Sequence, residues 1–402
     1  MGRVNAAPSI SERVFGSILD RSSLTAPDDV PDLVTEHARM LGALEVTLYR
    51  VDYEQVSLIP LGGKGIGERE PLTIDATLAG RAFRFVQVLE QEVDDCRRVW
   101  IPLIDGTERV GVMELSIDEI DEALLAAFRQ LAGVAADLIL SKSQYGDSME
   151  LARRRKPMSL AAEIHWHLLP PLTFGTERVV ISGVLEPAYE VGGDAFDYAV
   201  NGDITHLAVF DAMGHGLEAS LLVAVAVGAY RSARRRRLDL ESAYAEMDEA
   251  VHHQFGTERF VTGMFGELNL SNGRLRWVNA GHPPPLLVRR GRVVKSLECS
   301  PSLPLGLSGS VVEITEESLE RGDRVLFYTD GVVEARSTEG EFFGQRRLAD
   351  MLGRESASAQ PAPETMRRLS LAVMEHQEGA LQDDATMLLV EWLSGEVDGL
   401  VV

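Results

Sequence analysis

Ile204-Thr-His-Leu-Ala-Val-Phe-Asp-Ala-Met-Gly-His-Gly216 is the stretch that decides the fold. Residues 204–210 have the pattern of a buried strand, and the apolar run 217–230 that follows is typical of a helix. Asp211 therefore stands at the end of a strand, where two glycines let the backbone turn sharply. Because a buried carboxylate is costly unless a cation or several donors meet it, the stretch also predicts a binding site.

Other acidic residues stand in similar settings along the chain. Asp194 follows two glycines, Asp330 follows the strand-like run 324–328, and Asp383-Asp384 precedes the strand-like run 387–391. We interpret these acids as gathering with Asp211 into one oxygen-rich site. Mg²⁺ and Mn²⁺ prefer such oxygen ligands, and the sequence has no His/Cys cluster with zinc spacing.

Composition excludes several classes of function. The chain has 402 residues with 45% hydrophobic and 25% charged residues, an ordinary globular mixture. Its net charge of -23 argues against nucleic acid or an anionic membrane as the main partner. Only Cys96 and Cys299 occur, far apart, and no apolar signal core opens the chain. We therefore expect a cytoplasmic protein without a disulfide.

Residues 30–141 have the pattern of a small α+β domain. We expect helices over 32–41, 78–85 and 121–139 and strands over 44–51, 55–61, 98–104 and 109–115, with a loop at 62–65 and a hairpin turn at Asp105-Gly106. This order, with the hairpin Ile101-Pro-Leu…Gly111-Val-Met-Glu-Leu115, resembles the GAF sensor family. The resemblance implies a module that binds a small molecule or a module that forms a dimer.

The helix 121–139 also carries a heptad-like seam. The spacing allows either packing on the domain's own sheet or a parallel dimer helix. We expect a homodimer, a tail or short helix over 1–29 and a helical linker over 142–172 with a helix near 158–168. The seam consists of Leu124, Phe128, Leu131, Ala135 and Leu138.

Residues 173–396 alternate many strands with a few long helices. Hairpin turns at Asn201-Gly202, Asn272-Gly273 and Arg290-Gly291 favour an antiparallel β-sandwich flanked by helices, so the whole chain is predicted to be α+β. The expected strands are 179–185, 195–200, 204–210, 260–270, 274–279, 285–288, 324–328 and 386–392, and the expected helices are 217–237, 240–255, 343–352 and 363–378.

The ordered motifs of this region resemble a known family. They are Glu190-Val-Gly-Gly-Asp194, Asp211-Ala-Met-Gly-His-Gly216, Asn279-Ala-Gly-His-Pro-Pro284, Thr329-Asp-Gly-Val-Val-Glu334 and Asp383-Asp-Ala-Thr386. In order and approximate spacing they are similar to the metal-dependent (PPM, type 2C) serine/threonine phosphatases. The bacterial branch of stage II sporulation and Rsb-type phosphatases is the most similar one.

The resemblance implies two Mn²⁺ or Mg²⁺ ions and a role for each acid. Asp211 would bridge the ions and the Ala212 carbonyl would bind one of them. Asp194 would hold a metal or its water, and Asp330 and Asp383 would bind the second metal. Asp384 would orient Asp383 or replace it. A bridging hydroxide would attack phosphoserine or phosphothreonine in line.

Two residues depart from the pattern of the eukaryotic members. Tyr189 stands where many carry a phosphate-binding Arg, and Met213 stands where many carry a His that serves as a candidate acid. His215 is a candidate substitute for that His. His282 is interpreted as a structural residue that holds a turn.

The resulting hypothesis is a metal-dependent phosphoprotein phosphatase regulated by a GAF domain. Its substrate would be a phosphorylated anti-sigma-factor antagonist or a similar signalling protein. The alternative hypothesis is a catalytically silent switch that binds partners through the same fold.

Overall fold

The computed structural model describes residues 10–63, 69–190, 192–309, 311–358, 360–378 and 383–393. The chain divides into two compact units, of which the first holds residues 1–155 and the second residues 156–398. The division falls inside the expected 142–172 linker. Part of the expected loop at 62–65, namely residues 64 and 65, lies outside the described residues.

The first unit is built on a six-stranded antiparallel sheet in the order β3-β2-β1-β6-β5-β4. Residues of α1, α2 and α4 fill the core on one face of this sheet, and residues of α3 pack on the other. The elements are α1 (Ile10–Ser22), α2 (Val30–Met40), β1 (Glu45–Val51), β2 (Ser57–Pro60), β3 (Leu72–Thr73), α3 (Leu78–Phe85), β4 (Leu89–Val93), β5 (Cys96–Asp105), β6 (Glu108–Ile117), α4 (Glu122–Lys142) and α5 (Ser148–Ala152).

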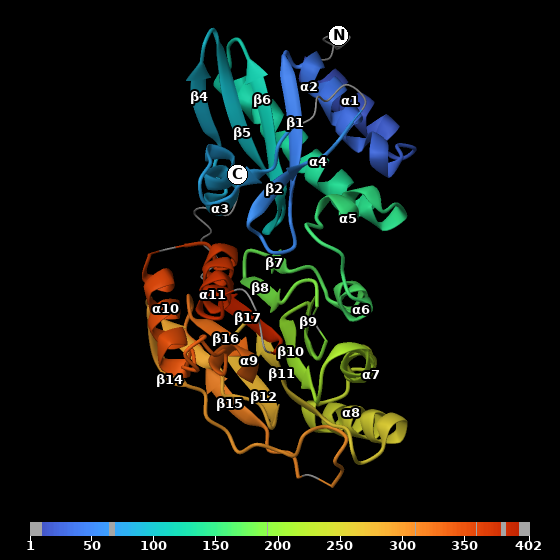
Figure 1. Ribbon diagram of the computed structural model, residues 1–402, viewed down its shortest axis with the longest axis vertical. Helices are drawn as coiled ribbons and strands as arrows, with labels where there is room; N and C mark the ends of the chain where they lie inside the picture. Colours follow the sequence, from blue (N-terminus) through green and yellow to red (C-terminus); the bar gives the residue numbers. More distant parts are fainter. Residues whose placement is uncertain are drawn as a thin grey trace, which may run out of the picture. The chain divides into compact units, whose positions relative to one another are not determined.

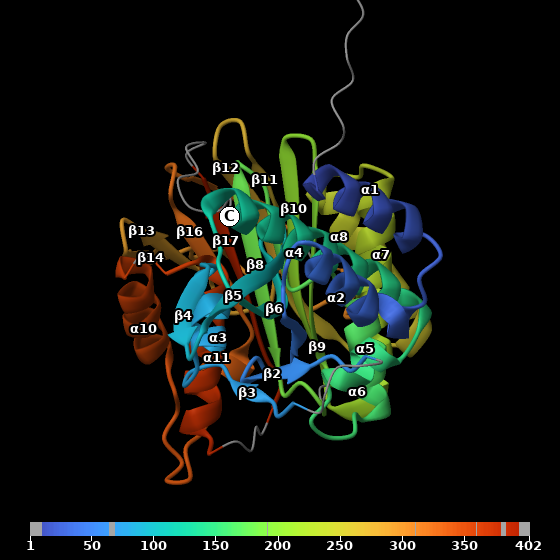
Figure 2. The same cartoon turned by 90° about the horizontal axis from the view of Figure 1, so that it is seen from above.

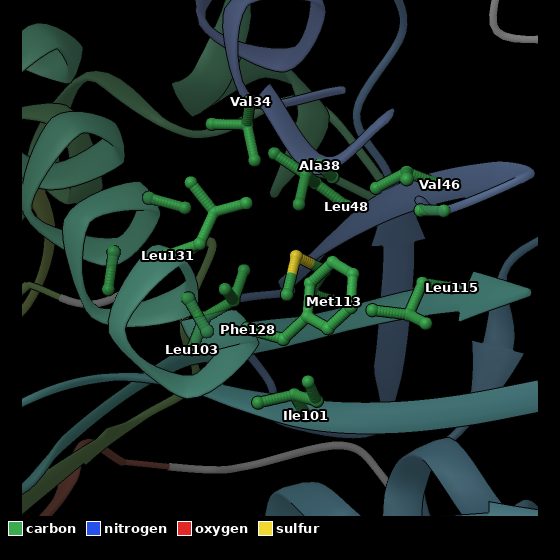
Figure 3. Packing of buried hydrophobic residues seen from close by; sticks show 14 of the residues in the cluster. Val34, Ala38, Val46, Leu48, Ile101, Leu103, Met113, Leu115, Phe128 and Leu131 are labelled. Carbon is green, nitrogen blue, oxygen red and sulfur yellow. The ribbon is translucent and has the colours of Figure 1, made fainter. Parts of the chain in front are cut away.

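The heptad-like seam of α4 lies in the core of its own unit. Phe128 and Leu131 are fully buried and face Met113 and Ile101 of the sheet, as Figure 3 shows. Packing on the sheet is therefore confirmed as the role of this spacing. By length and composition, the helical stretch 122–145 is long and apolar enough to cross a membrane, and 44% of its apolar window is buried inside the protein.

The expected N-terminal tail is likewise part of this unit. Val14 and Ile18 of α1 are fully buried in the same core as α2 and α4. Asp121 caps the start of α4, because its Oδ1 accepts a hydrogen bond of 2.7 Å from the Leu124 amide. Gly106 has a φ of +59°, so the predicted hairpin turn between β5 and β6 is confirmed.

The second unit is the predicted antiparallel sandwich. One sheet has the order β15-β12-β11-β10-β9 and the other the order β14-β13-β16-β17-β8-β7. The strands are β7 (Thr173–Gly175), β8 (Val179–Glu186), β9 (Asp194–Asn201), β10 (Ile204–Ala212), β11 (Val261–Asn269), β12 (Arg274–Ala280), β13 (Leu286–Arg289), β14 (Arg292–Ser296), β15 (Thr315–Ser318), β16 (Arg324–Tyr328) and β17 (Ala385–Trp392).

Helices flank the sandwich on both sides, with α7 and α8 on one and α10 and α11 on the other (Figures 1 and 2). The two sheets share a core that includes Phe196, Trp277 and Leu388. A second core lies between α7, α8 and the β9–β12 sheet. The helices are α6 (Leu160–Leu168), α7 (Gly216–Arg235), α8 (Leu240–Phe255), α9 (Asp330–Val333), α10 (Gln345–Ala357) and α11 (Ala362–His376).

Candidate metal and phosphate site

Asp194 and Asp211 face each other on neighbouring strands. Asp194 opens β9, Asp211 lies near the end of β10, and the two residues are directly opposite in the antiparallel register. Directly opposed residues project from the same face of a sheet. Asp194 is 1% exposed and Asp211 is partly buried, so two acids predicted from distant motifs do lie together.

The glycines around these acids allow two loops to pack backbone against backbone. A Cβ on Gly192 would lie 2.3 Å from the Gly216 nitrogen, and a Cβ on Gly193 would lie 2.8 Å from the Ala212 oxygen. Gly214 and Gly216 have φ values of +97° and +72°, which confirms the sharp turn expected after Asp211. The close approach itself depends on the upstream glycine pair.

Thr329 links the third motif to Asp194. Its hydroxyl donates a hydrogen bond of 2.7 Å to Asp194 Oδ2 and accepts one of 3.0 Å from the Thr386 amide. Thr329 is fully buried, and the next residue, Asp330, is exposed at the start of the short helix α9. Sequence reasoning missed Thr329, although it stands directly before a predicted ligand.

The two adjacent acids before β17 point in different directions. Asp384 Oδ2 accepts hydrogen bonds from three consecutive amides, those of Gly192, Gly193 and Asp194, at 2.8, 2.5 and 3.2 Å. Asp383 is exposed, and its Oδ1 accepts a hydrogen bond of 2.9 Å from the Asp384 amide. Of the alternatives left open by the sequence, the structure thus favours Asp383 as the acid available to a metal.

Mutual repulsion connects the acids of all four segments. Burial and the charges of Asp211 and Asp384 raise the pKa of Asp194 well above its ordinary range. Burial and the charges of Asp330, Asp383 and Asp384 raise the pKa of Asp211 to about 7. Burial also raises the pKa of Asp383, and the charges of Asp384 and Asp330 add to the effect. A cation among these groups would remove this cost.

The chemistry of the donors fits a hard divalent cation. Asp194 and Asp211 are opposite each other, the charges of Asp330 and Asp383 act on Asp211, and the Ala212 carbonyl lies beside the loop that holds Asp194. Among the described residues, however, no three Asp, Glu, His or Cys side chains are arranged so that they could hold a metal ion as they stand. Asp384 in particular is engaged with backbone amides.

His282 is buried near Asp211, with Thr262 between the two side chains. Asn279 Oδ1 accepts a hydrogen bond of 2.6 Å from the His282 amide, and Asn279 Nδ2 donates one of 2.8 Å to the His282 carbonyl. Burial lowers the pKa of His282 to about 4. Thr262 Oγ1 lies 3.3 Å from His282 Nδ1 and 3.5 Å from Asp211 Oδ2. The turn is held by the Asn279 side chain on the His282 backbone, and the role of the His282 side chain stays a prediction. Thr262 is a neighbour that the sequence did not indicate.

The residues that depart from the family pattern differ in exposure. Tyr189 is 1% exposed, with the Lys156 ammonium 5.0 Å from its ring centroid. Met213 and His215 are exposed beside Asp211. A basic group at this rim is Arg259, whose Nη1 would lie 3.9 Å from a Cβ on Gly214 and whose Nη2 is 2.7 Å from Glu218 Oε1.

Comparison with known families gives a match that includes Asp211, Asp330, Asp383 and Asp384 and begins after Asp194. Residues 201–393 match the model of the Stage II sporulation protein E (SpoIIE) family. Among curated proteins, the chain is 27% identical to Protein IcfG of Synechocystis over 59% of this chain and 41% of IcfG. It is 22% identical to the phosphoserine phosphatase RsbU of Bacillus subtilis over 59% of this chain and 70% of RsbU. The chain thus spans less than half of IcfG and more than two thirds of RsbU.

Solved structures with partial similarity include phosphatase domains. The SiaA-PP2C domain of Pseudomonas aeruginosa aligns over 63% of this chain and 98% of its own length, with 24% identity and a TM-score of 0.49. The RsbU and RsbW domains of Rv1364c from Mycobacterium tuberculosis align over 54% of this chain and 60% of theirs, with 28% identity and a TM-score of 0.47.

Proposed function

We propose that the second unit is a divalent-metal-dependent phosphoserine or phosphothreonine phosphatase, and the match of residues 201–393 to the SpoIIE family model and the similarity to the phosphoserine phosphatase RsbU support this. The observation that carries the proposal is the convergence of carboxylates from four separate segments. Their pKa values are raised by burial and by one another at Asp194 and Asp211.

In this proposal the site holds two Mn²⁺ or Mg²⁺ ions. Asp211 contacts both ions, the Ala212 carbonyl and Asp194 serve one side, and Asp330 and Asp383 serve the other. When bound, such ions supply an activated water and neutralise charge on the phosphoryl oxygens. The glycine turn 214–216 leaves the mouth of the site open to a phosphorylated side chain, because Gly214 and the neighbouring Met213 and His215 are exposed.

Arg259 is our candidate for the group that binds the substrate phosphate. Tyr189 occupies the position of the family's phosphate-binding Arg and is buried, so the cation must come from elsewhere in the chain. The Arg259 guanidinium lies beside the Gly214 turn and is held there by Glu218. A guanidinium matches phosphate geometry with two parallel hydrogen bonds.

The substrate and the regulation of this site are further parts of the proposal. The motif resemblance leads us to propose, as the substrate, a phosphorylated cytoplasmic signalling protein of the anti-sigma-factor antagonist type, and the similarity to the phosphoserine phosphatase RsbU supports a phosphoserine protein. The first unit, a six-stranded antiparallel sheet with helices on both faces, is proposed as a GAF-like regulatory module in a homodimer. Sedimentation of the full chain tests for the homodimer, and the phosphatase activity of the full chain is compared with that of residues 157–402. A monomeric full chain with the same activity as residues 157–402 would contradict this part of the proposal.

The alternative is a silent switch that binds partners without hydrolysis. One observation favours it: the described side chains do not form a ready group of three metal ligands. The four acids with mutually repelling charges favour the enzyme. A protein that only binds partners would gain nothing from the unfavourable free energy of burying these charges together.

The deciding assay is hydrolysis of p-nitrophenyl phosphate and of a phosphoserine protein with and without Mn²⁺. We expect turnover that requires the metal and is lost in Asp211→Asn. The exposed Asp350→Asn, in the same unit, is the matched control that keeps native activity. Equal rates for native protein and Asp211→Asn would remove the site assignment.

A further inference from the structure

Asp384 is the acid whose contacts the metal proposal does not use. We propose that Asp384 is a positioning residue: it fixes the backbone of the 192–194 turn, and thereby Asp194, and is not itself a metal ligand. The part about the metal rests on the proposed function. The fixing of the turn does not, because it concerns contacts within the protein alone.

One oxygen of the Asp384 carboxylate accepts hydrogen bonds from three consecutive amides. The amides of Gly192, Gly193 and Asp194 all donate to Asp384 Oδ2, at 2.8, 2.5 and 3.2 Å. Hydrogen bonds from amides to a carboxylate are charge-assisted and stronger than neutral ones. Oδ2 with three such donors has little capacity left for a cation, and the amides would have to be released before this one of the two carboxylate oxygens could bind one.

The backbone around Asp384 packs closely on the segment that contains Thr329 and Gly331. Gly331 packs so closely on it that a Cβ at position 331 would lie 1.8 Å from the Asp384 carbonyl oxygen. Two residues further on, Thr386 exchanges backbone hydrogen bonds with the Thr329 segment: the Thr329 amide donates to the Thr386 carbonyl at 3.0 Å, and the Thr386 amide donates to Thr329 Oγ1 at 3.0 Å. The carboxylate is thus presented to the turn from a fixed backbone.

Asp194 makes hydrogen bonds to both neighbouring segments, one to Asp384 and one to Thr329. Asp384 fixes the Asp194 backbone through its amide, and Thr329 fixes the Asp194 side chain through Oδ2 at 2.7 Å. Ser220 Oγ adds a hydrogen bond of 2.9 Å to the Gly192 carbonyl. The buried Asp194 is thus fixed at both its backbone and its carboxylate.

The two adjacent acids therefore have different proposed roles, Asp383 as a metal ligand and Asp384 as a positioning residue. Asp383 is exposed and close enough to Asp330 for their charges to interact, which suits a metal ligand. Asp384 Oδ2 instead accepts hydrogen bonds from the backbone of a loop that is 190 residues away in sequence. An Asn at position 384 keeps an acceptor oxygen for the amides, whereas an Asn at position 383 keeps the shape and loses the ligand charge.

The test compares Asp384→Asn, Asp384→Ala and Asp383→Asn in the full-length chain. Hydrogen exchange at the amides 192–194 is measured without metal, and Mn²⁺ affinity is measured by titration calorimetry. In Asp384→Ala we expect exchange at least about tenfold faster than in the native protein, with Asp384→Asn close to native and Asp383→Asn unchanged. For Mn²⁺ we expect a loss of about tenfold or more in Asp383→Asn and a much smaller loss in Asp384→Asn.

Two results would overturn the proposal. One is native exchange at these amides in Asp384→Ala, which would show that the carboxylate does not fix the turn. The other is a loss of Mn²⁺ affinity in Asp384→Asn as large as that in Asp383→Asn, which would make Asp384 a ligand. If the native chain binds no Mn²⁺, the proposed function fails, and the exchange measurement alone still decides whether Asp384 fixes the turn.

Discussion

The substitution Asp211→Asn is expected to stabilise the metal-free protein above neutral pH while it abolishes metal binding. Burial and the charges of Asp330, Asp383 and Asp384 raise the pKa of Asp211 from 3.8 to about 7. An acid with a raised pKa costs nothing below its unfolded pKa, because it is protonated in both states. The cost grows as the pH rises and reaches its full value above the folded pKa.

The size of the effect follows from the shift. A change from 3.8 to about 7 corresponds to about 4 kcal/mol of unfavourable free energy at pH 8, shared with the neighbouring acids that cause it. Asn has no charge to bury, so the substitution should recover much of this cost at pH 8 and almost none at pH 4. With metal present, the native protein should be more stable than Asp211→Asn, because the metal binds and stabilises only the protein that keeps Asp211.

The assay is calorimetric unfolding of the full chain with a chelator at several pH values between 4 and 8. The transition of the second unit is followed, because the two units need not unfold together. The difference in stability between Asp211→Asn and native protein should rise with pH and level off above about 7. A difference that stays constant with pH, or one that Asp350→Asn reproduces, would refute the reasoning.

Three further substitutions test the contacts around the site. Gly331→Ala places a Cβ 1.8 Å from the Asp384 carbonyl oxygen and should lower the free energy of unfolding by about 1–3 kcal/mol. Gly228→Ala is the control and should not lower it, because no atom lies within 4 Å of its Cβ, and calorimetry compares the two variants. Thr329→Val removes the hydrogen bond to Asp194 and leaves the Thr386 amide without its acceptor, so it should cost about 1–3 kcal/mol and reduce Mn²⁺ affinity in titrations, while an unaltered affinity would speak against this contact. Arg259→Ala should raise KM for a phosphoprotein about tenfold with a smaller change in kcat, and Glu218→Gln, which keeps the guanidinium, should not; equal effects would assign the loss to the ion pair.

The main elements could be predicted because their sequence periods are local. The strand expected at 179–185 is β8 at Val179–Glu186, and the helix expected at 240–255 is α8 with the same bounds. The short strands β7, β14 and β15 were missed, since three to five partly exposed residues carry too little alternation to predict a strand. The seam of α4 gave the correct spacing, but spacing alone does not say which surface covers it.

From the sequence, the site could be predicted only where a local pattern indicates the role of a residue. The glycine turns and the acids at strand ends are local signals, and the structure brings Asp194 and Asp211 into register. The hydrogen bonds from the 192–194 amides to Asp384 join segments about 190 residues apart, so no local pattern could indicate them. The same holds for Thr329, whose partner Asp194 lies 135 residues upstream.

The claim on which the account depends is that acids from four segments form a site for divalent cations. Titration calorimetry of the full chain with Mn²⁺, beside Asp211→Asn and the control Asp350→Asn, tests it most directly. We predict binding in the native protein and in Asp350→Asn, with affinity that increases as the pH rises toward about 7, and little or no binding in Asp211→Asn. Equal binding in all three proteins, or no binding in any, would contradict it.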